Sequence, residues 1–565
     1  MPSSAFNGST GSHTLMWPPG TSCLADISPS TGDAIINLQP RPSDDPNDPL
    51  NWTPGRKYWN MGLVCFYVAM VAEFINASTP TWGPMESQLG FSDEIMNDSY
   101  AAGCAGLAVG SLVLIPFALK FGRRPLYLFS TVVQFGICIW SAKIQTVGDL
   151  MAVNVIQCFF ASLAEAIVQM TIADLFFVHQ RGRMNALYVW TWLLSTYLGI
   201  LVAGFVADGL GWRWIWWLNA IICGVTIFVV AFGYEETKFC PRPVESAMTN
   251  LHPVLSDENT SGAMKFRNHD TGEDGAKNLN DKSATQRSQS DAEKSARELG
   301  SVEAAEDSRR ETTPRPALNP NIPMKTYWQR LALITPTTSS GAAHDTFFQH
   351  MFQPLCTGSW WPWAMSCRPR CPPTYPRRPT TSPPTSLPRM IGVTIGAIIV
   401  GPLSDWWIVY LARRRHGIFQ PETRLWCMIP FLPFVVVGAV LFAIGLSDHR
   451  PWPVIAVGLA LYNIGVTPIN TLTITYLTDS YREIIGDALV GVTLTRNTFS
   501  TVFIFALSPW VARVGLKDTF VTILVLAVAI LLAFVVFLRY GKSLRGFSAS
   551  RYLYYAARQY KERSG

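Results

Sequence analysis

The chain alternates between long uncharged apolar runs and short polar segments. A helix that crosses a bilayer needs about 20 mostly apolar residues, and eleven stretches come close to or meet that length. They are residues 58–81, 99–119, 126–142, 150–173, 187–207 and 214–234, followed after a long polar segment by 390–411, 425–446, 452–477, 488–512 and 520–538. The pattern predicts an all-α integral membrane protein with two groups of helices.

Lys and Arg residues mark alternate loops between these stretches. The basic clusters are Lys120 with Arg123 and Arg124, Arg181 with Arg183, Arg413 to Arg415 with Arg424, and the segment 539–563. The first intervening loop, residues 83–98, has no Lys or Arg and contains four acidic residues. Because positive residues are retained in cytoplasmic loops, we expect both tails and the central polar segment to lie in the cytoplasm.

This orientation places both the central polar segment and the Arg413–Arg415 cluster in the cytoplasm. The span 390–411 alone cannot join two segments on the same side, so the chain must cross the membrane once more before residue 390. The available stretch is 346–365, which contains one His, two Pro and two Gln, and it is followed by a segment rich in Pro and Arg. Irregular backbone in lipid leaves its polar groups unpaired. We interpret residues 366–389 as the product of a frameshift or mis-spliced exon that has corrupted span 7 and the start of span 8; a genuine Pro-rich loop is the alternative.

Composition excludes several classes of protein. Only 15% of the residues are charged, against about 25% in a soluble domain, and many of those charges lie between residues 235 and 315. The remaining charges are too few to solvate a globular surface, which argues against a soluble enzyme or a nucleic-acid binder. The 11 cysteines are scattered and predict neither a disulfide framework nor a metal site.

The polar segments set the expected domain boundaries. We expect a disordered cytoplasmic N-terminal tail over residues 1–56, a first lobe over 57–234, a largely disordered cytoplasmic loop over 235–345, a second lobe over 346–540 and a basic cytoplasmic tail over 541–565. Few aromatic and many polar residues favour disorder in the central loop. Within it, residues 324–334 favour a short interfacial helix.

Two basic loop motifs occupy equivalent places in the two halves. The first consists of Gly122, Arg123, Arg124 and Pro125, and the second of Gly401 and Asp405 followed by Arg413 to Arg415. With two six-span halves and a long central loop, they resemble the major facilitator superfamily, whose usual loop pattern is G-x-x-x-D-R-x-G-R-R. Leu119 stands here where the family has Asp.

Further motifs resemble the fungal twelve-span drug:proton antiporter branch of that superfamily, close to members that carry polyamines and other organic cations. They are residues 172–182 (IADLFFVHQRG), 211–214 (GWRW), 51–52 (NW) and 476–481 (YLTDSY). The resemblance covers residues 48–234 and 390–540. It implies two six-helix lobes, related by a pseudo-twofold axis, that move against each other in alternating access.

The resemblance also implies a conformational latch. In the family the loop arginine pairs with an acid at the end of span 4, here Asp174. Because Leu119 has no carboxylate, we expect a weakened first latch and a larger share of the closure at Asp405. The candidate latch residues are Gly122, Arg123, Arg124, Asp174, Asp405, Arg413 and Arg414.

Span 5 departs in part from the antiporter motif G-P-x-x-G-G. Gly199 and Gly204 match it, whereas Ile200 and Ala203 replace Pro and Gly. Small residues at this spacing also serve close helix packing, which is the role we assign to Gly199 and Gly204. Asn154 stands where those antiporters have an Arg linked to proton transfer, a second departure from the pattern.

Charged residues inside predicted spans are the strongest functional signal, because each costs about 2.5–3.5 kcal/mol at a helix centre. Glu73 lies in span 1 with Asn76 on the same face, Glu165 lies in span 4 with Gln169 one turn away, and Arg496 lies in span 11. A structural ion pair is one explanation. The functional alternative places the glutamates on a cavity wall, as proton acceptors or anchors for a cationic substrate.

Span 10 is unusually polar and contains Pro468, which can break the helix at mid-depth. Transporters build binding sites from such interrupted helices. We therefore predict that Tyr462, Asn463 and Asn470 line the same cavity as the charged residues.

Together these features predict a secondary active transporter rather than an enzyme. No nucleotide-binding loop of the G-x-x-x-x-G-K-[ST] type occurs, so we expect the proton gradient to supply the energy, with no cofactor or metal. The predicted activity is efflux of a small organic cation, polyamine or amphiphilic drug by a monomer in the lipid bilayer, with no nucleic-acid partner. The plasma membrane is the expected location and the vacuolar membrane the alternative.

Two alternative functions stay open. One is a proton symporter that imports a nutrient or polyamine. The other is a non-transporting product or membrane sensor that results from a damaged second lobe.

Overall fold

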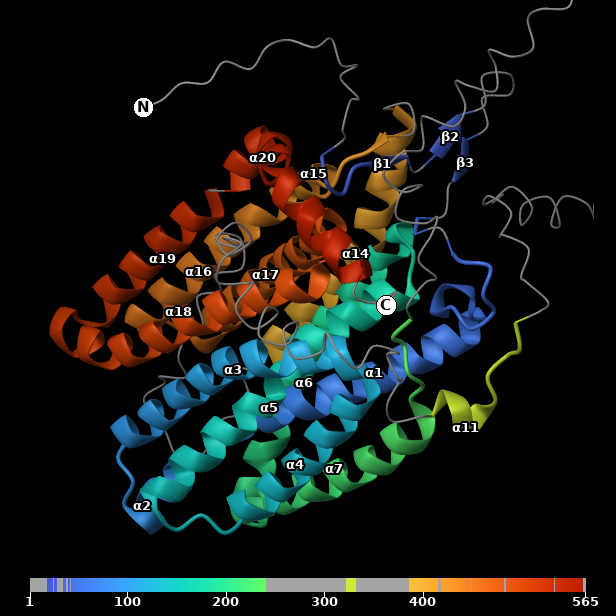
Figure 1. Cartoon of the computed structure of the whole chain (residues 1–565). Helices are drawn as coiled ribbons and strands as arrows, with labels where there is room; N and C mark the ends of the chain where they lie inside the picture. The colour runs from blue at the N-terminus through green and yellow to red at the C-terminus, as the bar shows by residue number, and fades with distance from the viewer. Residues whose placement is uncertain are drawn as a thin grey trace, which may run out of the picture.

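The computed structural model describes residues 18–23, 25–27, 34–36, 39–40, 42–239, 322–331, 386–414, 418–448, 450–481, 484–532 and 534–561. Its regular structure is almost entirely helical, and the two halves of the chain form neighbouring groups of helices (Figure 1). The predicted span 346–365, residues 366–385 of the anomalous segment and most of the central loop lie outside the described residues.

The first half of the chain forms six long helices, here called the N-lobe. They are α1 (Pro54–Asn76), α3 (Asp93–Phe121), α4 (Arg124–Ser141), α5 (Val147–Leu175), α6 (Val178–Gly209) and α7 (Arg213–Gly233), with η2 (Thr79–Thr81) and α2 (Trp82–Leu89) between α1 and α3. Side chains cap two of these helices: Ser92 accepts from the Ile95 N–H at the start of α3, and Thr146 with Asp149 forms a capping box at the start of α5. All six predicted spans correspond to these helices.

The described part of the second half, here called the C-lobe, starts at residue 386, within the anomalous segment. It contains α14 (Ser386–Arg414), α15 (Glu422–Leu425), η4 (Trp426–Phe431), α16 (Leu432–Ser447), α17 (Trp452–Ser480), α18 (Ile485–Val514), α19 (Leu516–Leu532) and α20 (Phe534–Lys561). Helix α14 continues past Asp405, as the short apolar run at 390–404 requires. Helix α20 extends through the predicted tail as far as Lys561.

Three main pairs of helices join the lobes. Helix α3 packs along α18, and α6 packs along α14 and α17. The packing inside each lobe is also repeated: Gly110 of α3 meets α5, and Gly392 of α14 meets α17, so closely that an added Cβ would lie 2.2 and 2.3 Å from a backbone oxygen. This repetition confirms the predicted all-helical, two-lobe fold.

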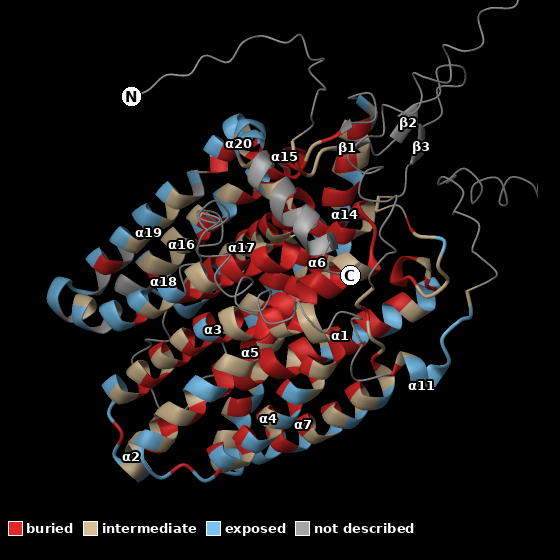
Figure 2. Ribbon diagram, viewed as in Figure 1, coloured by how far each residue is buried: buried red, intermediate tan, exposed pale blue. Residues whose placement is uncertain are grey.

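The outer surface of the bundle is apolar. Figure 2 shows buried residues concentrated on the central helices α5, α6 and α17, whereas α7 and α19 have exposed faces. Phe205, Phe228 and Ile398 on the outside of the bundle are 62–68% exposed. Ten helices in the described part of the chain are long and apolar enough to cross a membrane. An apolar surface on such helices suits lipid rather than water, and the protein is a multi-pass membrane protein.

The helix termini rich in Lys and Arg gather at one end of the bundle, here called the basic end. Short elements lie there too: η1 (Pro49–Asn51), α11 (Tyr327–Arg330), and two antiparallel ladders that pair β1 (Ser22–Cys23) with β4 (Ile418–Phe419) and β2 (Ala25–Ile27) with β3 (Ala34–Ile36). Helix α11 falls inside the predicted interfacial segment 324–334.

The described residues of the N-terminal segment 1–56, for which the sequence predicts disorder, make specific contacts. The carboxylate of Asp48 accepts from the Leu50 N–H at 2.9 Å, and Lys57 Nζ donates to the Leu50 carbonyl oxygen at 2.9 Å. Near the start of the described chain, Arg545 of α20 donates to the Pro19 carbonyl oxygen. These contacts satisfy backbone groups that the polar composition alone would leave to water.

Candidate functional site

A pocket between the lobes brings together two of the charged residues inside the predicted spans. It is lined by Glu165 of α5, Tyr188, Val189 and Trp192 of α6, Ile474 of α17, and Arg496 and Ser500 of α18. Arg496 Nη2 and the Glu165 carboxylate form an ion pair from opposite lobes. Asn497 Nδ2 donates to the same carboxylate oxygen at 3.1 Å. We call this site the interlobe pocket.

The two partners of this ion pair are bonded unequally. The Glu165 side chain is 4% exposed and the Arg496 side chain 18%. Arg496 reaches the carboxylate through Nη2, while its buried Nε has no hydrogen-bond partner among the described residues. A guanidinium has five N–H donors, so this arginine makes fewer hydrogen bonds than it can.

Several predicted substrate residues are not among those that line the interlobe pocket. Asn76 donates to the Ala72 carbonyl oxygen of its own helix at 2.7 Å. Tyr462 packs against an apolar cluster, and Asn470 is half-buried. The Gln169 side chain, one turn from Glu165, is buried, and its amide has no hydrogen-bond partner within the described chain.

The polarity of span 10 is used mainly within the helix. Hydroxyl groups of Thr467, Thr471 and Thr475 donate to carbonyl oxygens four residues earlier, at 2.6–3.0 Å, a common way to satisfy Thr in an apolar setting. Asn463 accepts from the Tyr197 hydroxyl at 2.9 Å and so links α17 to α6. The contribution of α17 to the interlobe pocket is the apolar Ile474.

Glu73 lies at a separate place in the N-lobe. The amide nitrogen of Asn219, turned toward the carboxylate, lies 2.7 and 3.2 Å from its two oxygens. Within the described residues Glu73 forms no ion pair. Gly199 allows α6 to approach, because an added Cβ would lie 2.6 Å from Glu73 Cγ. Gly204 faces open space, so its predicted packing role is wrong.

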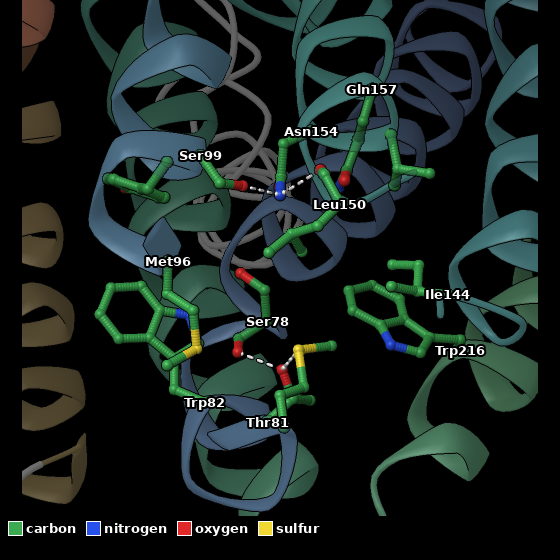
Figure 3. A pocket seen from close by; sticks show the side chains of 13 residues that line it. Ser78, Thr81, Trp82, Met96, Ser99, Ile144, Leu150, Asn154, Gln157 and Trp216 are labelled. Atoms are coloured by element: carbon green, nitrogen blue, oxygen red, sulfur yellow. Dashed lines mark hydrogen bonds between the residues drawn. The ribbon is translucent and has the colours of Figure 1, made fainter. Parts of the chain in front are cut away.

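A second pocket lies within the N-lobe, at the end opposite the basic end. Figure 3 shows Trp82 and Trp216 at opposite sides of it, with Ser99 and Asn154 between α3 and α5. Asn154 Nδ2 donates to Ser99 Oγ at 2.5 Å and to the Leu150 carbonyl oxygen at 3.0 Å. The amide at this position thus links two N-lobe helices, and every lining residue belongs to the N-lobe.

The basic end holds a second interlobe network. Asp405 of α14 accepts from the backbone N–H groups of Gly182 and Arg183, in the first turns of α6, both at 3.1 Å. A carboxylate near a helix N-terminus is stabilised by the helix dipole. An added Cβ at Gly182 would lie 2.2 Å from Asp405 Oδ1, so this approach requires glycine.

Arg424 extends the network to Asp479. Its Nε donates to Asp479 Oδ2 at 2.6 Å, its Nη1 to Ser404 Oγ at 2.8 Å and its Nη2 to the Val178 carbonyl oxygen of α6 at 2.9 Å. Arg181 of the N-lobe lies 3.6 Å from the other Asp479 oxygen, and Arg424 lies 3.6 Å from Asp405. We call Arg181, Gly182, Asp405, Arg424 and Asp479 the interlobe latch.

The structure divides the predicted latch residues into three groups. Asp405 contacts the opposite lobe. Arg123 lies 3.1 Å from Asp174, but both belong to the N-lobe and do not join the lobes. Arg414 is exposed and lies over the Tyr410 ring at 4.8 Å, whereas the arginine near Asp405 is Arg424. The side chain of Arg413 lies outside the described part of the chain.

The first basic loop is held by an acid that sequence reasoning missed. The Glu236 carboxylate accepts from the backbone N–H groups of Arg123 and Arg124, both at 3.0 Å. Gly122 ends α3 with φ +111°, where a Cβ would meet that carboxylate. The Arg124 side chain donates to the Ala231 carbonyl oxygen at 2.6 Å rather than to Asp174.

Leu119 shows what replaces the missing family carboxylate. It packs against Gly486 in the first turn of α18, within 3.0 Å of where a Cβ would lie. This contact is equivalent in place to that of Asp405 with α6. The bundle therefore closes at the basic end by an apolar contact on one side and by the charged interlobe latch on the other.

We predict that Gly182→Ala opens the basic end. The added methyl group would overlap Asp405 and separate α6 from α14, so a cysteine placed at the buried Ala412, which packs with Val178 of the other lobe, should react several-fold faster with a maleimide. Gly204→Ala is the matched control, since it makes the same change in the same helix where space is open. Equal reaction rates in the two variants would contradict this role for Gly182.

Comparisons with known proteins agree with the observed architecture. The family model described as Major Facilitator Superfamily matches residues 55–290. An uncharacterized MFS-type transporter of Schizosaccharomyces pombe is 29% identical over 92% of this chain and 90% of its own length. Protein HOL1 of Saccharomyces cerevisiae is 27% identical over 93% and 92%. The efflux pump radE of Floropilus chiversii is 30% identical over 34% of this chain and 36% of its own length.

A solved structure shares the fold. The MFS proton:xylose symporter XylE bound to 6-bromo-6-deoxy-D-glucose aligns with a TM-score of 0.53 and 13% identity over 86% of this chain and 97% of that chain. At this identity the likeness concerns the fold alone. The family match over residues 55–290 and the two relatives aligned over nine-tenths of their length support membership of the major facilitator superfamily of membrane transporters.

Proposed function

We propose that the chain is a proton-coupled transporter that moves a small organic cation out of the cytoplasm by alternating access of its two lobes. The observation that carries the proposal is the Glu165 carboxylate, which lies between the lobes and forms an ion pair there with Arg496. A carboxylate at membrane depth is costly and typically marks a substrate or ion pathway. Rocking of two lobes about such a pocket exposes it to each side in turn.

The interlobe contacts on the two sides of the pocket differ in kind, which supports such rocking. Toward the basic end, which we propose faces the cytoplasm, the charged interlobe latch joins α6 to the C-lobe. Toward the other end, the described contacts include the Tyr197–Asn463 hydrogen bond at 2.9 Å and Asn97 Nδ2 to the Ile504 carbonyl oxygen at 3.3 Å. The structure corresponds in this scheme to a form closed toward the cytoplasm.

We assign proton coupling to Glu73 rather than to Glu165. A carboxyl without a cationic partner can take up and release a proton without breaking an ion pair, whereas protonation of a carboxyl paired with arginine breaks that pair. Glu73 has the amide partner Asn219 and Glu165 has the cation partner Arg496. Two carboxyls in such different environments can take different roles, here the proton carrier for Glu73 and the binding group for the cation for Glu165.

The outward direction and the antiporter branch belong to this proposal. They are supported by the motif residues 172–182 and by the partial match to a protein described as an efflux pump. We further propose that the protein acts at the plasma membrane and draws its energy from the proton gradient alone.

The test is accumulation of labelled spermidine and of a small panel of organic cations, in cells with and without the full chain. We expect the chain to lower accumulation of at least one cation and a protonophore to remove the difference. A raised, protonophore-sensitive accumulation would replace this proposal with import by symport. No effect on any cation would favour a non-transporting product.

We predict that Glu73→Gln uncouples transport from the proton gradient. Glutamine keeps the size and the hydrogen bond to Asn219 but has no exchangeable acidic proton, so gradient-driven efflux should fall at least about tenfold while exchange of labelled for unlabelled cation persists. Glu94→Gln, at an exposed position in the first turn of α3, serves as control. Full gradient-driven efflux in Glu73→Gln would remove this residue from proton coupling.

A further inference from the structure

The buried arginines of this chain differ in how fully their guanidinium groups are bonded. Arg424 donates from Nε, Nη1 and Nη2 to partners at the basic end. Arg545 also donates from all three nitrogens. Arg496 donates from Nη2 to Glu165, while its buried Nε has no partner within the described chain. Arg424 and Arg545 are held by bonds from all three guanidinium nitrogens, so the half-buried Arg496 can leave its partner with less loss than these two.

A hydrogen-bond acceptor beside Glu165 is also unused. A carboxylate only accepts hydrogen bonds, so Asn497 must turn Nδ2 toward Glu165 and Oδ1 away from it. That Oδ1 atom is buried and has no hydrogen-bond partner among the described residues. A buried acceptor without a donor is destabilising, so the contact between Asn497 and Glu165 leaves one polar atom of the interlobe contact unsatisfied.

The walls of the interlobe pocket suit the body of a cationic ligand. Tyr188 and Trp192 of α6 line it and are 5% and 8% exposed. Aromatic faces attract cations and bury apolar surface at the same time. The pocket thus combines a carboxylate with two aromatic side chains, and the present cationic partner of that carboxylate is a side chain of the C-lobe.

We propose that Arg496 is an internal stand-in for the substrate: its guanidinium occupies the place on Glu165 that the substrate's head group takes during transport. The substrate class that follows is a protonated amine or guanidine, whose N–H groups can replace the Arg496 N–H group that now donates to Glu165. A quaternary ammonium carries the same charge but has no N–H group, so it cannot reproduce the bond that it must displace. This inference rests on the proposed function, since it requires cation transport through the interlobe pocket.

The replacement of Arg496 by the substrate also couples substrate binding to the movement of the lobes. Glu165 belongs to the N-lobe and Arg496 to the C-lobe. When the substrate takes the carboxylate, the direct bond between the lobes is exchanged for a bond from Glu165 to the substrate. Binding therefore changes what holds the lobes together, which is the differential contact that a ligand needs in order to shift a conformational equilibrium.

The first arm of the test uses the wild-type full chain in liposomes. The probes are phenethylammonium and N,N,N-trimethylphenethylammonium, which share ring and charge and differ in their N–H donors. We expect the primary amine to be transported with a kcat/KM at least about tenfold higher, since a hydrogen bond to a charged group is lost in the other. Propylguanidinium should inhibit more strongly than propyltrimethylammonium. Equal handling within either pair would overturn the inference.

The second arm removes the internal competitor. Arg496→Gln should lower the KM for phenethylammonium about tenfold, whereas Arg496→Lys, which retains a cation, should leave it near the wild-type value. Arg450→Gln is the matched control, because Arg450 lies 3.9 Å from Asp448 in an exposed pair outside the pocket. An unchanged or raised KM in Arg496→Gln would overturn the inference. If this variant does not fold, the wild-type arm decides.

The proposed function and the stand-in role of Arg496 can be disproved separately. If the wild-type chain moves neither probe nor any cation of the wider panel, the proposed function is wrong. If it moves cations of the panel but treats the primary and quaternary amines alike, the proposed function stands and only the stand-in role of Arg496 is wrong.

Discussion

Glu165→Gln is expected to reduce cation transport at least about 100-fold in kcat/KM. Glutamine cannot attract a cation, so the contact between Glu165 and the cationic substrate is lost, and truncation of one partner of a buried, hydrogen-bonded charge pair costs about 3–5 kcal/mol of binding free energy. At 1.4 kcal/mol per factor of ten, that is a factor of about 100 or more. The measurement is uptake of a labelled cation into proteoliposomes, normalised to the amount of folded protein.

A double variant separates the two explanations of this ion pair. Glu165→Gln with Arg496→Gln removes both charges, so a purely structural pair would be replaced by two neutral amides and the protein should regain stability. If Glu165 anchors the substrate, thermal stability should recover relative to Glu165→Gln while transport stays lost. Recovery of transport in the double variant would assign the pair to structure alone.

Arg424→Gln is expected to shift the protein away from the form closed at the basic end. Arg424 is the shared cation of Asp405 and Asp479, whose side chains are 5% and 0% exposed. Its removal leaves Arg181 and Arg183, each 3.6 Å from one of these acids. An uncompensated buried charge costs about 3–5 kcal/mol, which lowers the closed population relative to the open one about 100-fold or more.

The measurement for this prediction is maleimide labelling of a cysteine at Ala412, which is buried beside Val178 of the opposite lobe. Labelling should accelerate in Arg424→Gln. Arg414→Gln is the matched control, because Arg414 is exposed over Tyr410 and joins no part of the interlobe latch. An unchanged labelling rate in Arg424→Gln would show that the network does not hold the basic end closed.

The helices were largely predictable because a bilayer imposes a simple length and polarity rule on each one separately. The six N-lobe spans and the completion of α14 beyond Asp405 follow from this rule. The order of residues 42–52 does not, because it depends on contacts such as Lys57 with Leu50 that give a polar segment local partners.

The site could be predicted only in part, because its partners lie far apart in the sequence. The charges at Glu165 and Arg496 stand out, but their pairing joins residues 331 positions apart and depends on how α5 meets α18. The polarity of span 10 predicts a cavity-lining helix, but the structure gives it another role. Thr467 and Thr471 donate hydrogen bonds within their own helix.

The interlobe latch shows the same limit. Arg181 and Arg424 appear in the sequence as markers of orientation, and Asp479 as part of a motif at a helix end. Their shared network exists only because α6 begins against α14 and α17. The sequence predicts Arg414 as a latch residue, but its guanidinium lies over the ring of Tyr410.

The most direct test of the central claim is proton-driven movement of phenethylammonium in liposomes that contain either the wild-type chain or the Glu165→Gln and Arg496→Gln double variant. The account predicts that the wild-type chain concentrates the amine only while a pH gradient is present, and that the stable double variant does not. Equal transport by the two proteins, or concentration of the amine without a gradient, would contradict the claim that Glu165 binds the transported cation in a proton-coupled cycle.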